Sequence, residues 1–93
     1  MRHFFVGKFE LGMVVATPGV LHATTEDERI SALTRHINGD WGEVCEEDKQ
    51  ANDEGLLVND RLLSAYYNEL GEKFWIITES DRSATTFLLP SEY

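Results

Sequence analysis

Residues 61–89 read RLLSAYYNELGEKFWIITESDRSATTFLL, and they contain three runs rich in β-branched and aromatic residues. The runs cover 61–67, 73–79 and 84–89, and the short segments between them, 68–71 and 80–83, contain Asn, Gly, Asp and Ser. Such short turns join neighbouring strands antiparallel. We therefore expect a β-meander of three strands with residues 73–79 in its centre.

Both faces of the central strand are partly apolar. Side chains alternate between the two faces of a strand, so Phe74 and Ile76 lie on one side, and Trp75 and Ile77 lie on the other. One face can pack against helices. The other face, with Leu88 beside it, needs a cover from the N-terminal strand, a second copy of the chain or a partner.

The N-terminal part predicts a fourth strand and two helices. Residues 8–15 place Phe9, Leu11, Met13 and Val15 on one side, the two-residue period of a strand that ends at Ala16. Thr17-Pro18 reads as an N-cap followed by proline at the first helical position, and opens one or two turns through Leu21.

A second helix begins with a capping box. Thr25 can bond the amide of Glu28, and the Glu28 carboxylate can reach back to Thr25. Apolar residues then fall on one face, and Asn38-Gly39 supplies a left-handed stop.

A third, acidic helix is expected over residues 43–57. At about 100° per residue, one side gathers the residues expected to face inward: Val44, Cys45, Asp48, Ala51, Asn52 and Leu56. The opposite side gathers the residues expected to face solvent: Glu46, Glu47, Lys49, Gln50, Asp53 and Glu54.

Length, composition and charge narrow the class of protein. Ninety-three residues suit one domain, so we expect residues 1–93 to form one α+β domain, with a meander of three to four strands against two or three short helices. The net charge of −9 repels nucleic-acid phosphates, so a direct DNA or RNA ligand is not expected. One cysteine cannot close an internal disulfide and no long apolar run is present, which favours a cytoplasmic protein that does not enter the membrane.

No convergent catalytic set stands out. Cys45 with His22 or His36 lacks a local nucleophile signature, and a lone cysteine beside Val44 is typical of a small core residue. The spacing of Glu43, Glu46 and Glu47 suits a hard cation in principle, but the calcium-loop pattern is absent, so neither a metal nor a cofactor is expected.

Two sets of binding residues are left open. Two-thirds of the net charge lies in residues 40–54, where seven acids meet one lysine. The first set is the acidic helix side with Glu46, Glu47, Asp53 and Glu54. The second is a polar pocket around the Gly39–Gly42 loop, with Asp40, Trp41, Asp48, Asn52 and Arg82. Trp41 itself is typical either of an interface or of a loop that is pinned to the core.

Several stretches resemble a known family. They are Val15-Ala16-Thr17-Pro18-Gly19, Gly39-Asp40-Trp41-Gly42, Glu46-Glu47-Asp48 with Ala51-Asn52-Asp53, Leu63-Ser64-Ala65-Tyr66, Trp75-Ile76-Ile77-Thr78-Glu79, Asp81-Arg82-Ser83 and Leu88-Leu89-Pro90. Together they resemble small bacterial proteins of unassigned function, labelled hypothetical or plasmid-related and found on chromosomes and mobile elements. The resemblance spans most of the chain and implies no activity and no catalytic residues.

The expected function is a non-enzymatic protein-binding or regulatory module whose partner carries a cationic surface. One sharper version is a DNA mimic that occupies the cationic groove of a nuclease or regulator. The alternative is a small ligand-binding protein or enzyme that uses the pocket around Gly39–Gly42.

Overall fold

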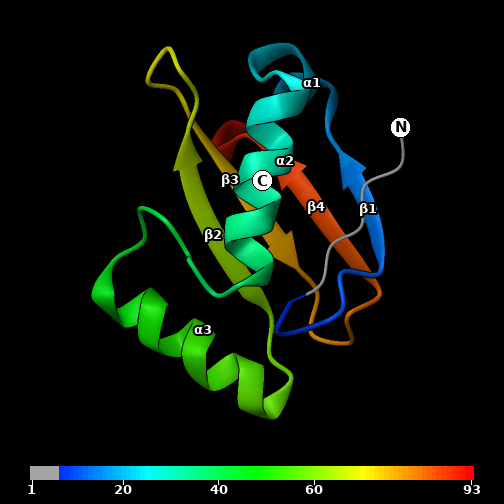
Figure 1. The fold of residues 1–93 in the computed structure, drawn as a ribbon, viewed down its shortest axis with the longest axis vertical. Coiled ribbons are helices and arrows are strands. Elements are labelled where there is room, and N and C mark those ends of the chain that lie inside the picture. The colour runs from blue at the N-terminus through cyan, green and yellow to red at the C-terminus, as the bar shows by residue number, and fades with distance from the viewer. Residues whose placement is uncertain (1–6) are drawn as a thin grey trace.

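The computed structural model describes residues 7–93 and contains four strands, three α-helices and a C-terminal 3-10 turn (Figure 1). In chain order they are β1 (Met13–Ala16), α1 (Pro18–Ala23), α2 (Glu26–Ile37), α3 (Glu46–Val58), β2 (Leu62–Tyr67), β3 (Lys73–Thr78), β4 (Ala84–Leu88) and η1 (Pro90–Glu92).

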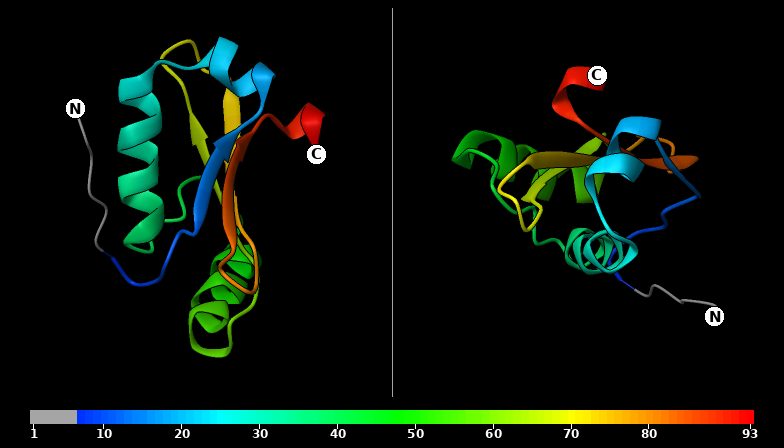
Figure 2. Two further views of the ribbon diagram at one scale, coloured as in Figure 1. Left: turned by 90° about the vertical axis from the view of Figure 1, so that its right-hand side faces the viewer. Right: turned by 90° about the horizontal axis from the view of Figure 1, so that it is seen from above.

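The strands form one sheet in the order β1-β4-β3-β2. The β2, β3 and β4 strands are antiparallel neighbours, which confirms the meander and the α+β class. The β1 strand pairs with β4 in parallel, with Met13 opposite Ala84, so the sheet is mixed rather than purely antiparallel. Figure 2 shows α2 on one face of this sheet and η1 on the other.

The α2 helix supplies the main layer over the sheet. Its capping box is formed as expected: Thr25 accepts from the Glu28 amide at 3.1 Å, and Glu28 accepts from the Thr25 amide at 2.8 Å. Gly39 follows with φ +80°, which confirms the left-handed stop. The buried core contains Val20, Ala32, Leu33, Tyr66, Phe74, Ile76 and Phe87.

The N-cap of α1 is also confirmed, and the capping residue contacts the C-terminal η1 turn. The Thr17 side chain accepts from the Val20 amide, and the Thr17 hydroxyl donates to Glu92 at 2.6 Å. Glu92 also accepts from the Gly19 amide at 3.1 Å. The η1 turn is thereby held against α1.

The first strand is shorter than the sequence predicts. It begins at Met13 instead of residue 8, because Gly12 has φ +65° and breaks the extended backbone. A side chain at Gly12 would collide with the backbone of Arg82 and Ser83. The close approach to the β3–β4 turn therefore requires glycine at this position.

The second sheet face is covered differently from our expectation. The β1 strand lies beside β4 in the sheet, not over this face, so the expected cover by the N-terminal strand is wrong. Ile77 and Leu88 are already buried within one chain, and the Trp75 ring meets the Tyr93 ring edge-on at 5.8 Å. The C-terminal residues thus provide part of the cover.

Candidate functional site

The four acids expected on the outer side of the third helix are all exposed on α3. We call Glu46, Glu47, Asp53 and Glu54 the acidic face. Asp53 has a second role, because its Oδ1 accepts a 2.9 Å hydrogen bond from the Trp41 indole N–H. The acidic face is therefore connected to the core through one of its own members.

The α3 helix begins at Glu46, three residues later than expected. The preceding residues instead extend the sheet: the Glu43 amide donates to the Ala65 carbonyl at 2.7 Å, and the Ala65 amide donates to the Trp41 carbonyl at 3.0 Å. Gly42 lies between these two bonds with φ +73°, a conformation that favours glycine. Residues 41–43 thus run along β2 before the helix starts.

Polar contacts hold α3 against the sheet. Asn52 and Gly55 are its buried residues, and the Asn52 amide group bonds both the N–H and the C=O of Leu63, at 3.0 and 2.7 Å. Leu57 is 85% exposed and Val58 is 65% exposed. The helix therefore presents an acidic surface with an apolar end instead of burying an apolar stripe.

Three residues expected to face inward from this helix do not. Cys45, Asp48 and Ala51 are exposed, so their assignment to the inner side is wrong. Cys45 precedes the helix as its N-cap and makes no side-chain capping bond. The helix touches β2 mainly through its second half, so its first turn stands clear of the sheet.

Because Cys45 is exposed and makes no capping bond, we expect its thiol to contribute little to stability or to binding. We expect Cys45→Ala to change the free energy of unfolding by less than about 0.5 kcal/mol, because an exposed side chain without a hydrogen bond contributes little. Partner binding should be unchanged as well. Chemical denaturation and a binding assay check this, and loss of binding by a folded variant would make the thiol functional.

The residues of the alternative pocket are distributed over three places. Asp48 and Asn52 line a shallow groove of about 290 Å³ together with Arg61 and Tyr93. Arg82, at φ +60°, donates to the backbone carbonyls of Gly55, Asp60 and Glu79, and so fixes the β3–β4 turn to the end of α3. Neither Asp40 nor Trp41 lines that groove.

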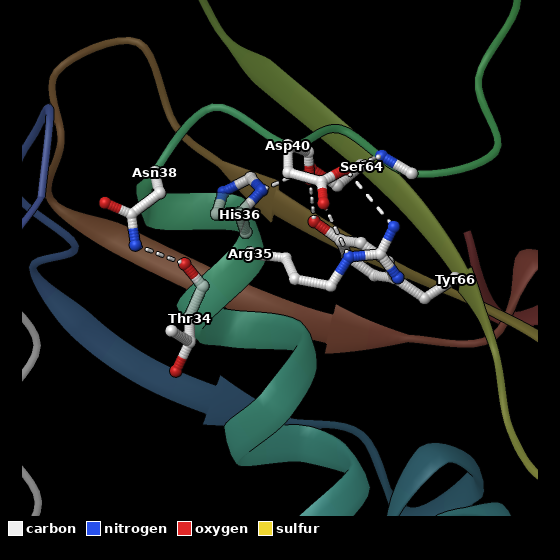
Figure 3. A network of polar contacts seen from close by, with 8 residues as sticks. Thr34, Arg35, His36, Asn38, Asp40, Ser64 and Tyr66 are labelled. Carbon is white, nitrogen blue, oxygen red and sulfur yellow. Dashed lines mark hydrogen bonds and ion pairs between the residues drawn. The ribbon is translucent and has the colours of Figure 1, made fainter.

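Asp40 is engaged in an ion pair at the end of α2 (Figure 3). Its carboxylate accepts two hydrogen bonds from Arg35, at 2.8 and 3.2 Å, and one from the Gly42 amide. The hydrogen bond from Arg35 holds the pKa of Asp40 below its ordinary value. The Arg35 guanidinium also lies 4.7 Å from the centre of the Tyr66 ring, whose hydroxyl donates to the Asp40 carbonyl.

Trp41 is buried, with 2% of its surface exposed. Its ring stacks on Phe9 and meets the His36 ring edge-on. Of the two roles that the sequence left open, the structure shows the packing role for this side chain.

The structure also contains a buried hydrogen-bond chain that sequence reasoning missed. His36 is fully buried on α2, and its ring nitrogens bond Ser64 on β2 at 2.5 Å and Thr78 on β3 at 2.8 Å. Thr78 continues to Thr85 on β4, whose hydroxyl donates to the Leu11 carbonyl at 2.7 Å. The one available signal was the position of His36 between Leu33 and Ile37 on the apolar side of the helix.

The donor and the acceptor in each hydrogen bond of this chain follow from the Leu11 carbonyl at its end. The Leu11 carbonyl only accepts, so Thr85 donates to it and must accept from Thr78. Thr78 then accepts from the Nε2–H of His36, and Nδ1 is left to accept from Ser64. This arrangement requires a neutral imidazole, and burial, assisted by the charge of Arg82, lowers the pKa of His36 to about 3.

This chain is a structural element and not a nucleophile with its base. Ser64 and His36 are both fully buried, so no substrate can reach them in this conformation. Cys45 is exposed and forms no hydrogen bond with His36. Within residues 7–93, no group of three or more His, Cys, Asp or Glu side chains is placed to hold a metal ion.

Comparison of the chain with protein-family models, with curated proteins and with solved structures finds no match. The resemblance to small bacterial proteins therefore stays a prediction. Over the described residues, none of the helices has the length and apolar character needed to cross a membrane.

Proposed function

We propose that the protein is a non-enzymatic protein-binding module that uses the acidic face of α3 to bind a cationic partner. The observation that carries this proposal is that α3 exposes all four acids and buries only Asn52 and Gly55. Polar contacts, Asn52 to Leu63 and Trp41 to Asp53, attach the helix, and its four outward acids stay free of ion pairs with described basic residues. Like charges crowded on one helix cost stability, so a binding role would offset that cost.

The contacts of the Gly39–Gly42 loop favour this proposal over the pocket alternative. Asp40 is bonded to Arg35, and Trp41 is covered by Phe9 and His36. Arg82 is bonded to three backbone carbonyls. These side chains would have to give up existing contacts before they could bind a ligand.

Neutralising the acidic face tests the proposal. In the quadruple variant Glu46→Gln, Glu47→Gln, Asp53→Asn and Glu54→Gln, we expect equal or slightly higher thermal stability, because like-charge repulsion is removed and the amide introduced by Asp53→Asn keeps an oxygen for the Trp41 indole. Proteins captured from the native cell by the wild type should be lost with this variant. For such a partner, the wild-type association rate should fall as salt rises, since exposed charges are screened beyond about 8 Å at physiological salt.

A matched control changes the net charge equally at other exposed acids: Glu10→Gln, Asp27→Asn, Glu69→Gln and Glu79→Gln. This variant should bind the partner at nearly the wild-type rate. If both variants bind as tightly as the wild type across a salt series, the acidic face serves solubility only. Displacement of the partner by duplex DNA would identify the DNA-mimic version.

A further inference from the structure

The two edge strands of the sheet, β2 and β1, differ in whether the described residues form hydrogen bonds with their outward backbone groups. At the β2 edge, Ala65 bonds residues 41 and 43, and Leu63 bonds the Asn52 side chain. The outward N–H and C=O groups of both Leu63 and Ala65 are therefore hydrogen-bonded within the chain. Proteins commonly protect an edge strand in this way, because an unpaired edge is a template for another strand.

The β1 edge has no such protection from residues 7–93. Met13 and Thr17 donate toward β4, to the carbonyls of Ser83 and Phe87, so the alternation of a strand directs the backbone groups of Val14 and Ala16 outward. No backbone hydrogen bond from the described residues reaches these outward groups. The strand carries no charge and no proline, the usual guards of an exposed edge.

The side chains along this edge are apolar and exposed. Met13, Val14 and Val15 are 69%, 45% and 39% exposed. Beside them, between β1 and α2, lies a largely apolar groove of about 200 Å³ whose lining includes Ile30, Leu33 and Phe87. An open backbone edge and an adjacent apolar surface therefore occur together.

We propose that a second copy of the chain pairs antiparallel with β1 through this edge and joins two sheets into one. The distribution of charge favours a second copy over a cationic partner here. The β1 strand is neutral, whereas two-thirds of the net charge of −9 lies in residues 40–54. The α3 helix, which carries most of those acids, packs beside β2 at the opposite edge of the sheet. Two copies can thus meet at β1 while their acidic faces stay apart.

The register follows from symmetry. A two-fold axis at Val15 places Val14 opposite the partner's Ala16, so each outward N–H meets a carbonyl of the other copy. Val15 then lies beside the partner's Val15, and paired β-branched side chains stabilise a sheet. A strand of four residues makes a small interface, so the dimer should be weak, with a dissociation constant on the order of 100 µM.

Two measurements on the full-length chain test this dimer. Sedimentation velocity should show the mean mass rise toward that of two chains as the concentration passes through the high micromolar range. Amide hydrogen exchange of Val14 and Ala16 should slow about tenfold once the dimer predominates by mass action. Exchange of Val15, which faces β4, should change much less.

A matched pair of variants locates the contact. Val14→Lys places a charge on the edge and should keep the protein monomeric, whereas Val58→Lys makes the same change on the exposed end of α3 and should dimerise like the wild type. Three results would overturn the proposal: a monomer throughout with fast exchange at Val14 and Ala16, slow exchange of both amides in a monomer at every concentration, or a dimer that Val14→Lys leaves intact.

Discussion

Replacing Trp41 with alanine is expected to lower the free energy of unfolding by about 4 kcal/mol, because a fully buried tryptophan leaves both a cavity and lost transfer energy. For a chain of this length, such a loss lowers Tm by roughly 20 °C. Thermal and chemical denaturation measure it. The effect should extend beyond the loop, since Trp41 contacts Phe9, His36 and the acidic helix through Asp53.

Two further variants separate packing from hydrogen bonding. Trp41→Phe keeps an aromatic ring against Phe9 but removes part of the indole together with the N–H that donates to Asp53, so we expect a loss below that of the alanine variant. Trp75→Ala removes the same side chain from a half-buried position against Tyr93 and should also cost less. If Trp41→Ala is no worse than Trp75→Ala, the indole is not the anchor of the loop.

Local sequence signals predicted the parts of the fold that local interactions determine. The Thr25 capping box, the Thr17-Pro18 start of α1 and the meander of 62–88 all depend on residues close together in the chain. The parallel pairing of β1 with β4 brings together Met13 and Ala84, and nothing near Met13 in the sequence indicates that partner. The glycine at position 12 marks the break in the strand, but the backbone it must avoid lies at 82–83.

For the candidate site, the sequence predicted the orientation of some α3 side chains correctly and of others wrongly. A helical wheel correctly placed Glu46, Glu47, Asp53 and Glu54 outside and Asn52 inside. It misplaced Cys45, Asp48 and Ala51 because a wheel assumes that a helix is covered along its whole length, whereas α3 is covered mainly along its second half, which contains the buried Asn52 and Gly55. Helical periodicity gives the direction of a side chain but not the extent of the surface that covers it.

The buried histidine predicts a specific loss of stability in mild acid. In the unfolded chain a histidine takes up a proton near pH 6.5, but His36 in the folded protein stays neutral until about pH 3. The unfolded state therefore binds more protons between these values, and the free energy of unfolding falls as the pH falls. The slope approaches about 1.4 kcal/mol per pH unit below about pH 6, so lowering the pH from 7.5 to 5 should cost about 2 kcal/mol.

Urea denaturation at intervals from pH 7.5 to 5 measures this slope, and the pH range assigns it to His36. Asp40, Glu28 and Glu92 have pKa values lowered by their hydrogen bonds, and their contribution to stability is lost only below about pH 4.5. His36→Gln should be less stable than the wild type at pH 7.5, since the variant loses the ring contacts with Phe9 and Trp41, but its stability should be nearly independent of pH down to 5. His22 is an exposed histidine on α1, and the His22→Gln variant should show the same dependence of unfolding free energy on pH as the wild type. A wild-type protein whose stability is flat between pH 6.5 and 5 would mean that His36 accepts a proton in place, with Ser64 turning to receive the new Nδ1–H.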